Sequence, residues 1–143
     1  MNIRIKRIDK TLPLPQYKTA GAAGFDLYAR TTITIKPKGI AYIPMNVVLE
    51  IPPGTWVLMA PRSSTHKLGI TAANSICIGD GDFCGDNDEY HFAAFNFTDT
   101  EVTIERGMRI AQMVLVNYSQ VQFEEVESFQ RENRGGFGST GLK

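Results

Sequence analysis

The chain has 143 residues, of which 43% are hydrophobic, and its formal net charge at pH 7 is zero. This length suits one domain, and the hydrophobic content is enough for a packed core and too high for a disordered protein. The zero net charge argues against a strongly basic nucleic-acid surface, so no nucleic-acid partner is expected. No apolar run approaches the roughly 18 residues of a membrane span. Because the N-terminus also lacks a signal-peptide core, we expect a soluble, cytoplasmic protein without a membrane partner.

Short strands separated by turns dominate the chain. Alternating apolar residues predict strands at several places, among them residues 3–8, 33–35, 56–58, 102–104 and 121–123. Turn residues separate them at 37–39, 52–54 and 105–107, and residues 63–68 are long enough for one or two helical turns. This pattern indicates an all-β barrel or jelly-roll domain. We place the domain at residues 1–127, because the polar, Gly-rich arm at 128–143 has no apolar alternation.

Polar residues interrupt the strand pattern first in AAGFDLYA, residues 22–29. Strand alternation points Asp26 away from its apolar neighbours Phe25 and Leu27, toward a surface or a site. The next interruption is PRSSTHKLGI, residues 61–70. There Ser63 and Ser64 are candidate helix caps and Arg62 is a candidate partner for phosphate or carboxylate. Each pattern also suits an ordinary turn or cap.

The third polar stretch, residues 74–92, is acidic and rich in glycine. Its spacing from Asp80 partly resembles a calcium loop, but His91 stands where an EF-hand needs its bidentate Glu, and the flanks read as strands. A hairpin with an acidic tip is the preferred interpretation. Cys77 and Cys84 complete no zinc pattern with His66 or His91, so we expect unpaired thiols.

The fourth stretch, ERGMRIAQMVL at 105–115, leads from a turn into a strand, with Arg109 and Gln112 as its polar entries. The order of the polar stretches, ending in GGFGSTG at 135–141, resembles the five motifs of the trimeric dUTP diphosphatase (dUTPase) family. The resemblance runs from about residue 18 to residue 141.

The resemblance implies a jelly-roll-like β domain assembled as a homotrimer, with active sites shared between subunits. The implied reaction is Mg²⁺-dependent hydrolysis of dUTP to dUMP and pyrophosphate, which keeps uracil out of DNA and supplies dUMP for dTTP synthesis. The arm of one chain would close the active site of a neighbour, which would explain its unusual composition.

The resemblance also implies roles for individual residues. Asp80 would bind the attacking water and act as general base, and Asp26 would contact Mg²⁺ through water. Phe83, where the family usually has Tyr, would stack on deoxyribose and leave no room for a 2′-OH. The residues expected to bind the remaining parts of the substrate are Arg62, Ser63, Ser64 and Gln112 for phosphates, Asn74, Gly79 and the 76–82 backbone for uracil, and Phe137, Gly138, Ser139 and Thr140 from the arm.

Three departures from the family pattern stand out. Gly79 occupies a position that is commonly Ile or Val, and residues 86–88 look like an acidic insertion. In the arm, Glu132 stands where the family usually has Arg. Either Arg131 or Arg134 would then contact the γ-phosphate, and we select Arg134.

Two alternatives compete with dUTP hydrolysis. A dCTP deaminase has a related fold and would share the Arg-Ser-Ser segment, but the GGFGSTG arm and the Asp80-x-Asp82-aromatic motif favour the diphosphatase. A nucleotide-binding regulator without catalysis would retain the fold, and the presence of Asp80, Arg62 and Gln112 argues against it.

Overall fold

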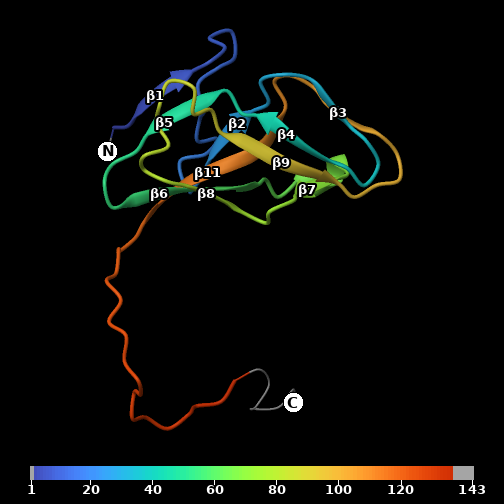
Figure 1. Ribbon diagram of the computed structural model, residues 1–143. Helices are drawn as coiled ribbons and strands as arrows, with labels where there is room; N and C mark the ends of the chain where they lie inside the picture. The colour runs from blue at the N-terminus through green and yellow to red at the C-terminus, as the bar shows by residue number, and fades with distance from the viewer. Residues whose placement is uncertain (1, 137–143) are drawn as a thin grey trace.

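The computed structural model describes residues 2–136 and consists almost entirely of short strands (Figure 1). Its one short 3₁₀ helix is η1 (Thr65–Leu68). The strands are β1 (Arg4–Arg7), β2 (Phe25–Tyr28), β3 (Ile33–Ile35), β4 (Ile40–Pro44), β5 (Val47–Glu50), β6 (Thr55–Pro61), β7 (Ile70–Ala72), β8 (Cys77–Gly79), β9 (His91–Asn96), β10 (Val102–Ile104) and β11 (Arg109–Asn117). The predicted all-β class and the helical turn within 63–68 are confirmed.

The strands pair antiparallel in four small sheets. A four-stranded sheet has the order β2-β11-β6-β8, a three-stranded sheet has the order β4-β9-β7, and β1-β5 and β10-β3 form two-stranded sheets. Figure 1 shows these sheets gathered into one body, from which the chain after β11 departs as an extended segment. The four-stranded sheet carries Asp26, Gly79 and Gln112, and Arg62 and Asp80 directly follow its strands β6 and β8; β8 is one of its edges.

Side-chain alternation builds the core between the sheets. In β6, Thr55, Val57 and Met59 are buried while the residues between them are only partly covered. Met113 of β11 and Ile43 of β4 are fully buried in the same cluster. Burial of such apolar side chains, at about 25 cal/mol per Å², is the main term that holds the sheets together.

The turns between strands match the turn residues of the sequence. Lys38, Gly54 and Gly107 have φ of 56°, 78° and 87°, in the left-handed region that tight turns require. Within the described residues, no helix is long and apolar enough to span a bilayer.

Two sequence predictions about strands are wrong. No strand forms at 121–123: β11 ends at Asn117, and Val121 and Phe123 are 66% and 95% exposed. Within residues 2–136 they pair with no neighbouring strand. The acidic stretch is also not the tip of a hairpin, because β8 pairs with β6 whereas β9 pairs with β4 and β7. It is instead a connection between two sheets.

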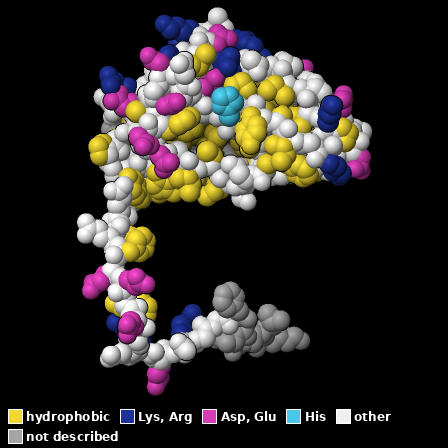
Figure 2. Space-filling model, viewed as in Figure 1, with side chains coloured by type: hydrophobic (Ala, Val, Ile, Leu, Met, Phe, Trp, Pro, Cys, Tyr) yellow, Lys and Arg dark blue, Asp and Glu magenta, His cyan; other side chains and the backbone are white. Residues whose placement is uncertain are grey.

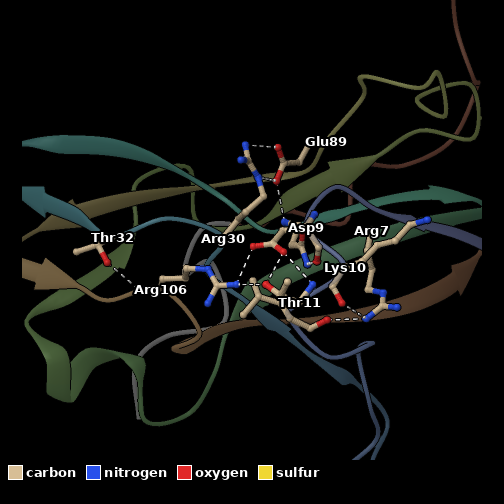
Figure 3. Close-up of polar contacts among 10 residues, drawn as sticks. Arg7, Asp9, Lys10, Thr11, Arg30, Thr32, Glu89 and Arg106 are labelled. Carbon is tan, nitrogen blue, oxygen red and sulfur yellow. Dashed lines mark hydrogen bonds and ion pairs between the residues drawn. The ribbon is translucent and has the colours of Figure 1, made fainter.

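A polar network ties the chain after β1 to the barrel (Figure 3). Asp9 accepts hydrogen bonds from the Thr11 hydroxyl at 2.6 Å and from Arg106 Nη2 at 2.7 Å. The buried side chain of Asn46 accepts from the Asp9 N–H at 2.6 Å. The hydrogen bonds from Thr11 and Arg106 hold the pKa of Asp9 well below its usual range.

This network predicts a pH-dependent contribution of Asp9 to stability. A depressed folded-state pKa stabilises the fold above the unfolded-state pKa, which is about 3.9, and the gain disappears as pH falls through the folded-state value. The Asp9→Asn variant should therefore be less stable than the parent at pH 7, with a gap that shrinks below about pH 4. Urea unfolding at pH 7, 5, 3 and 2 measures the gap. A gap that stays constant across this range would contradict the assignment.

Candidate functional site

A buried carboxylate joins two arginines at one end of the four-stranded sheet. Asp26 of β2 is 7% exposed, and each of its oxygens accepts a hydrogen bond from a different guanidinium. Arg62 Nε donates to Oδ1 at 2.8 Å, and Arg109 Nη1 donates to Oδ2 at 2.8 Å. Asp26 thus points away from the core as predicted, but it is not a surface residue.

We call Asp26, Arg62, Arg109 and Gln112 the Asp26 cluster. Gln112 lies directly opposite Asp26 in the β2–β11 register, and its Nε2 donates to the Pro61 carbonyl at 3.3 Å. The cluster contains one carboxylate and two guanidiniums, so its formal charge is positive. It therefore suits an anion such as a phosphate group.

A β-bulge places Arg109 in this cluster. The β2–β11 register shifts between Arg109 and Ala111, so that Arg109 lies opposite Tyr28 while Gln112 lies opposite Asp26. Tyr28 and Asp26 are two residues apart and share a face, so their partners Arg109 and Gln112 share it too. Without the bulge, a three-residue separation would put Arg109 and Gln112 on opposite faces. This is why strand alternation failed to identify Arg109 as a site residue.

The segment after Arg62 is fixed by Thr65 rather than by the predicted serine caps. Ser64 is the N-cap of η1, but its side chain makes no capping hydrogen bond. Instead the buried Thr65 hydroxyl accepts from the Arg62 N–H at 3.0 Å and donates to the Ile110 carbonyl at 2.7 Å. Ser63 and Ser64 are left exposed beside the Asp26 cluster.

The predicted general base lies in a different environment. Asp80 directly follows β8 and is exposed, on the lining of a cavity of about 310 Å³ that also contacts Trp56, Ile78 and Tyr118. The Asp80 carbonyl accepts from the Phe83 N–H at 3.2 Å, which closes a turn. Asn74 is exposed in the turn between β7 and β8.

Asp80 and Arg62 lie at opposite ends of β6. Gly79 pairs with Val57, which places Asp80 level with Trp56, whereas Arg62 follows the last residue of the strand. The separation from position 56 to position 62 is six residues, or about 20 Å at roughly 3.3 Å per residue. One phosphorus atom therefore cannot be close to Asp80 and Arg62 of the same chain.

A tyrosine that sequence reasoning did not identify lies against Asp80's neighbours. Tyr90 is 3% exposed, and burial raises its pKa to about 12. Its ring packs edge-to-face on Phe83, with centroids 5.2 Å apart. A Cβ added to Gly79 would lie 2.6 Å from Tyr90 Cε1. In the sequence, the one sign of this contact is that glycine occupies position 79, where the family that the sequence resembles commonly has Ile or Val.

The acidic stretch is attached to the barrel and does not form a metal cage. Asp86 pairs with Lys6 at 2.9 Å, Asp88 accepts from the Gly85 N–H at 2.7 Å, and Glu89 forms two 2.8 Å contacts with Arg30. Among residues 2–136, no three His, Cys, Asp or Glu side chains converge as metal ligands. Cys77 and Cys84 are free thiols, as predicted.

The arm begins within the described chain and continues beyond it. Arg131 and Arg134 are exposed in the segment that extends away from the barrel (Figure 1). The predicted substrate contacts Phe137, Gly138, Ser139 and Thr140 lie outside the described residues.

Comparison with known proteins identifies relatives along the whole chain. The dUTPase family model matches residues 10–141. The deoxyuridine 5′-triphosphate nucleotidohydrolase of Dictyoglomus turgidum is 38% identical over 149 residues, covering 99% of both chains. The enzyme of the same name from Hahella chejuensis is 40% identical over 144 residues, covering 96% of this chain and 93% of its own.

Solved structures show the same fold. The crystal structure of dUTPase from Streptococcus mutans has a TM-score of 0.76 at 28% identity, over 83% of this chain and 98% of that chain. The dUTPase of Staphylococcus bacteriophage 80alpha, solved with dUpNHpp, has a TM-score of 0.86 at 22% identity, over 99% of both chains. The second likeness concerns the fold alone.

From the contacts of the Asp26 cluster we expect that neutralising the Asp26 carboxylate destabilises the fold. Asp26→Asn keeps the shape but leaves two guanidiniums facing a neutral amide, one of whose ends is itself a donor. We expect a loss of about 3 kcal/mol in the free energy of unfolding, the low end for breaking a buried ion pair. The matched control is Asp99→Asn, because Asp99 pairs with Lys38 on the surface. This control should change stability by less than about 0.5 kcal/mol. Equal losses in urea unfolding would refute a special role for Asp26.

Proposed function

Because the chain belongs to the dUTPase family and is a dUTP diphosphatase, we propose that Asp80 activates the water that attacks the α-phosphorus of dUTP. The observation that supports this role is the contrast between two carboxylates. Both oxygens of Asp26 are occupied by arginines, whereas Asp80 is exposed beside a cavity. Among residues 2–136, Asp80 forms no ion pair, unlike Asp26, which supports Asp80 as the carboxylate that accepts the proton from water.

The proposed step is an in-line displacement. The water oxygen bonds to the α-phosphorus, its proton passes to Asp80, and the bond from the α-phosphorus to the bridging oxygen breaks. The products are dUMP and pyrophosphate. Arg62, Ser63 and Ser64 would bind the phosphate chain and Gln112 would contact the α-phosphate, which offsets the charge that spreads over the oxygens in the transition state.

Recognition of the base is proposed to use the edge of the four-stranded sheet. The strand β8 is an edge strand, so one side of its backbone carries N–H and C=O groups that no strand of the sheet pairs. These groups, with Gly79 and the Asn74 amide, would read the uracil edge. Phe83 would lie against the deoxyribose and exclude a 2′-OH, since its ring is already held on one side by Tyr90.

The active site is proposed to be shared between subunits of a homotrimer. The separation of about 20 Å along β6 between Asp80 and Arg62 supports a site in which Asp80 of one chain acts with Arg62, and with its neighbour Gln112, of another. Exposed apolar side chains support such an association. Ile40 and Tyr42 of β4 are 59% and 69% exposed, and Figure 2 shows hydrophobic side chains spread over one face of the barrel. Large exposed apolar patches mark association surfaces.

The arm, residues 128–143, is proposed to close a neighbouring active site. Phe123 and Phe129 are 95% and 83% exposed on the segment that leaves the barrel, which favours contact with another subunit over isolation in water. In this proposal Phe137 stacks on uracil, while Gly138, Ser139, Thr140 and Arg134 contact the β- and γ-phosphates.

Mg²⁺ is the proposed cofactor, and the donor set fits a metal that arrives with the nucleotide. Asp26 accepts two hydrogen bonds, and a carboxylate has about four acceptor positions, so it retains capacity for a metal-bound water. When bound, Mg²⁺ would neutralise phosphate charge. Asp26 would orient its water shell, and the two arginines would fix Asp26.

In the cell, this reaction would keep uracil out of DNA and supply dUMP for dTTP synthesis in the cytoplasm. A dCTP deaminase would instead release ammonia from dCTP, and a nucleotide-binding regulator would release neither ammonia nor pyrophosphate. Measuring both products therefore separates the three activities.

The decisive assay measures pyrophosphate release from dUTP, dCTP, dTTP and UTP, with Mg²⁺ and with EDTA. We expect Mg²⁺-dependent release from dUTP alone.

Asp80→Asn should lower kcat by at least about 10²-fold, the usual scale for losing a general base, and leave dUTP binding nearly intact. The control Asp86→Asn removes another exposed carboxylate of the same connection, outside the proposed site, and should leave kcat nearly unchanged.

Other outcomes would reject parts of the proposal. Ammonia release from dCTP would indicate the deaminase. Binding of dUTP without pyrophosphate release would indicate the regulator. Near-normal turnover of Asp80→Asn would mean that another group activates the water.

A further inference from the structure

A single buried ring contacts both sides of the turn that carries Asp80. Tyr90 packs on Phe83 with an interplanar angle of 73°. A Cβ on Gly79 would meet the same ring, 2.6 Å from Cε1, 2.7 Å from the hydroxyl oxygen and 3.0 Å from Cζ. The residue before Asp80 and the residue three positions after it therefore rest on one side chain.

The Tyr90 ring explains why position 79 is glycine. The φ of Gly79 is not in the positive range that favours glycine, so the backbone conformation does not require it. The ring occupies the space that any larger side chain would need. Gly79 and Tyr90 are thus a complementary pair. The ring of Tyr90, the residue before β9, fills the space that a side chain at the last position of β8 would otherwise occupy.

The backbone of Tyr90 is hydrogen bonded to the chain on either side of Asn46. Its N–H donates to the Val47 carbonyl at 3.1 Å, and its carbonyl accepts from the Met45 N–H at 2.9 Å. The preceding residue, Glu89, forms the two contacts with Arg30 that Figure 3 shows, and it also accepts from the Asn46 N–H at 2.8 Å. Residues 80–87, in contrast, are exposed.

From this arrangement we infer that Tyr90 is a positioning residue for selectivity between deoxyribose and ribose. The inference rests on the proposed function of Phe83. Exclusion of a 2′-OH requires that the Phe83 ring stay close to the sugar, and an unsupported ring at the end of an exposed turn could move aside. The Tyr90 ring blocks that movement from behind. Its edge-to-face packing, rather than its hydroxyl, supplies the support, because within residues 2–136 the hydroxyl has no hydrogen-bond partner.

The test compares kcat/KM for dUTP with kcat/KM for UTP in the full chain. Tyr90→Leu should lower this ratio about tenfold, a factor that the loss of one aromatic pair can produce. Tyr90→Phe keeps the ring and should keep the ratio within about twofold. The matched control is Phe92→Leu, which shortens a fully buried aromatic two residues along and should lower stability without changing the ratio.

A second variant covers the case in which Tyr90→Leu does not fold. Gly79→Ala leaves every aromatic ring in place but pushes on Tyr90, and it should also lower the ratio. Parental selectivity in Tyr90→Leu or Gly79→Ala would overturn the inference. If Tyr90→Phe lowered the selectivity ratio as much as Tyr90→Leu, the hydroxyl rather than the ring would be responsible. If Phe92→Leu lowered it as much, the effect would reflect general loss of stability and not a role of Tyr90. Absence of dUTP hydrolysis in the parent protein would instead reject the proposed function.

Discussion

The ion cluster around Asp26 is the constraint on which one half of the site depends. A carboxylate that is 7% exposed would be costly to bury alone, and two guanidiniums at 2.8 Å compensate it. These contacts join β2, the end of β6 and the start of β11 at one place. Because two cations surround one anion, the cluster retains a positive charge. The same interaction that allows Asp26 to be buried therefore prepares this end of the sheet for a polyanion.

The other half of the site depends on packing. Asp80 and Phe83 lie on an exposed turn, and the Phe83 ring packs on a buried ring, Tyr90, whose backbone N–H and C=O are both hydrogen bonded. The strand β6 connects the two halves and also keeps them about 20 Å apart. If Asp80 and Arg62 act on one substrate, as proposed, this separation requires that a second copy of the chain supply one of them. The distance between the two halves within one chain therefore supports the proposed sharing of sites between subunits.

Strand alternation was enough to predict the all-β class and the outward direction of Asp26, because both follow from a two-residue period. It failed where a bulge breaks the two-residue period and where a contact with a residue outside the strand determines the local structure. The bulge at 109–111 brings Arg109 beside Gln112, and no local pattern announces a register shift. Val121 and Phe123 alternate like a strand, yet no strand in the described part of the chain pairs with them. The contact at Gly79 joins the end of β8 to Tyr90, the residue before β9, and β8 and β9 belong to different sheets, so only the structure could show it.

Complementation between subunits tests the shared site most directly. Chains with Asp80→Asn and chains with Arg62→Gln are each expected to be inactive alone. The two kinds of chain are then unfolded, mixed in equal amounts and refolded together. If each site takes Asp80 from one chain and Arg62 from another, random assembly should restore activity in about a quarter of the sites. Mixing Asp80→Asn chains with the double variant should restore none. A mixture no more active than its separate components would contradict the shared site and place both residues' roles within one chain.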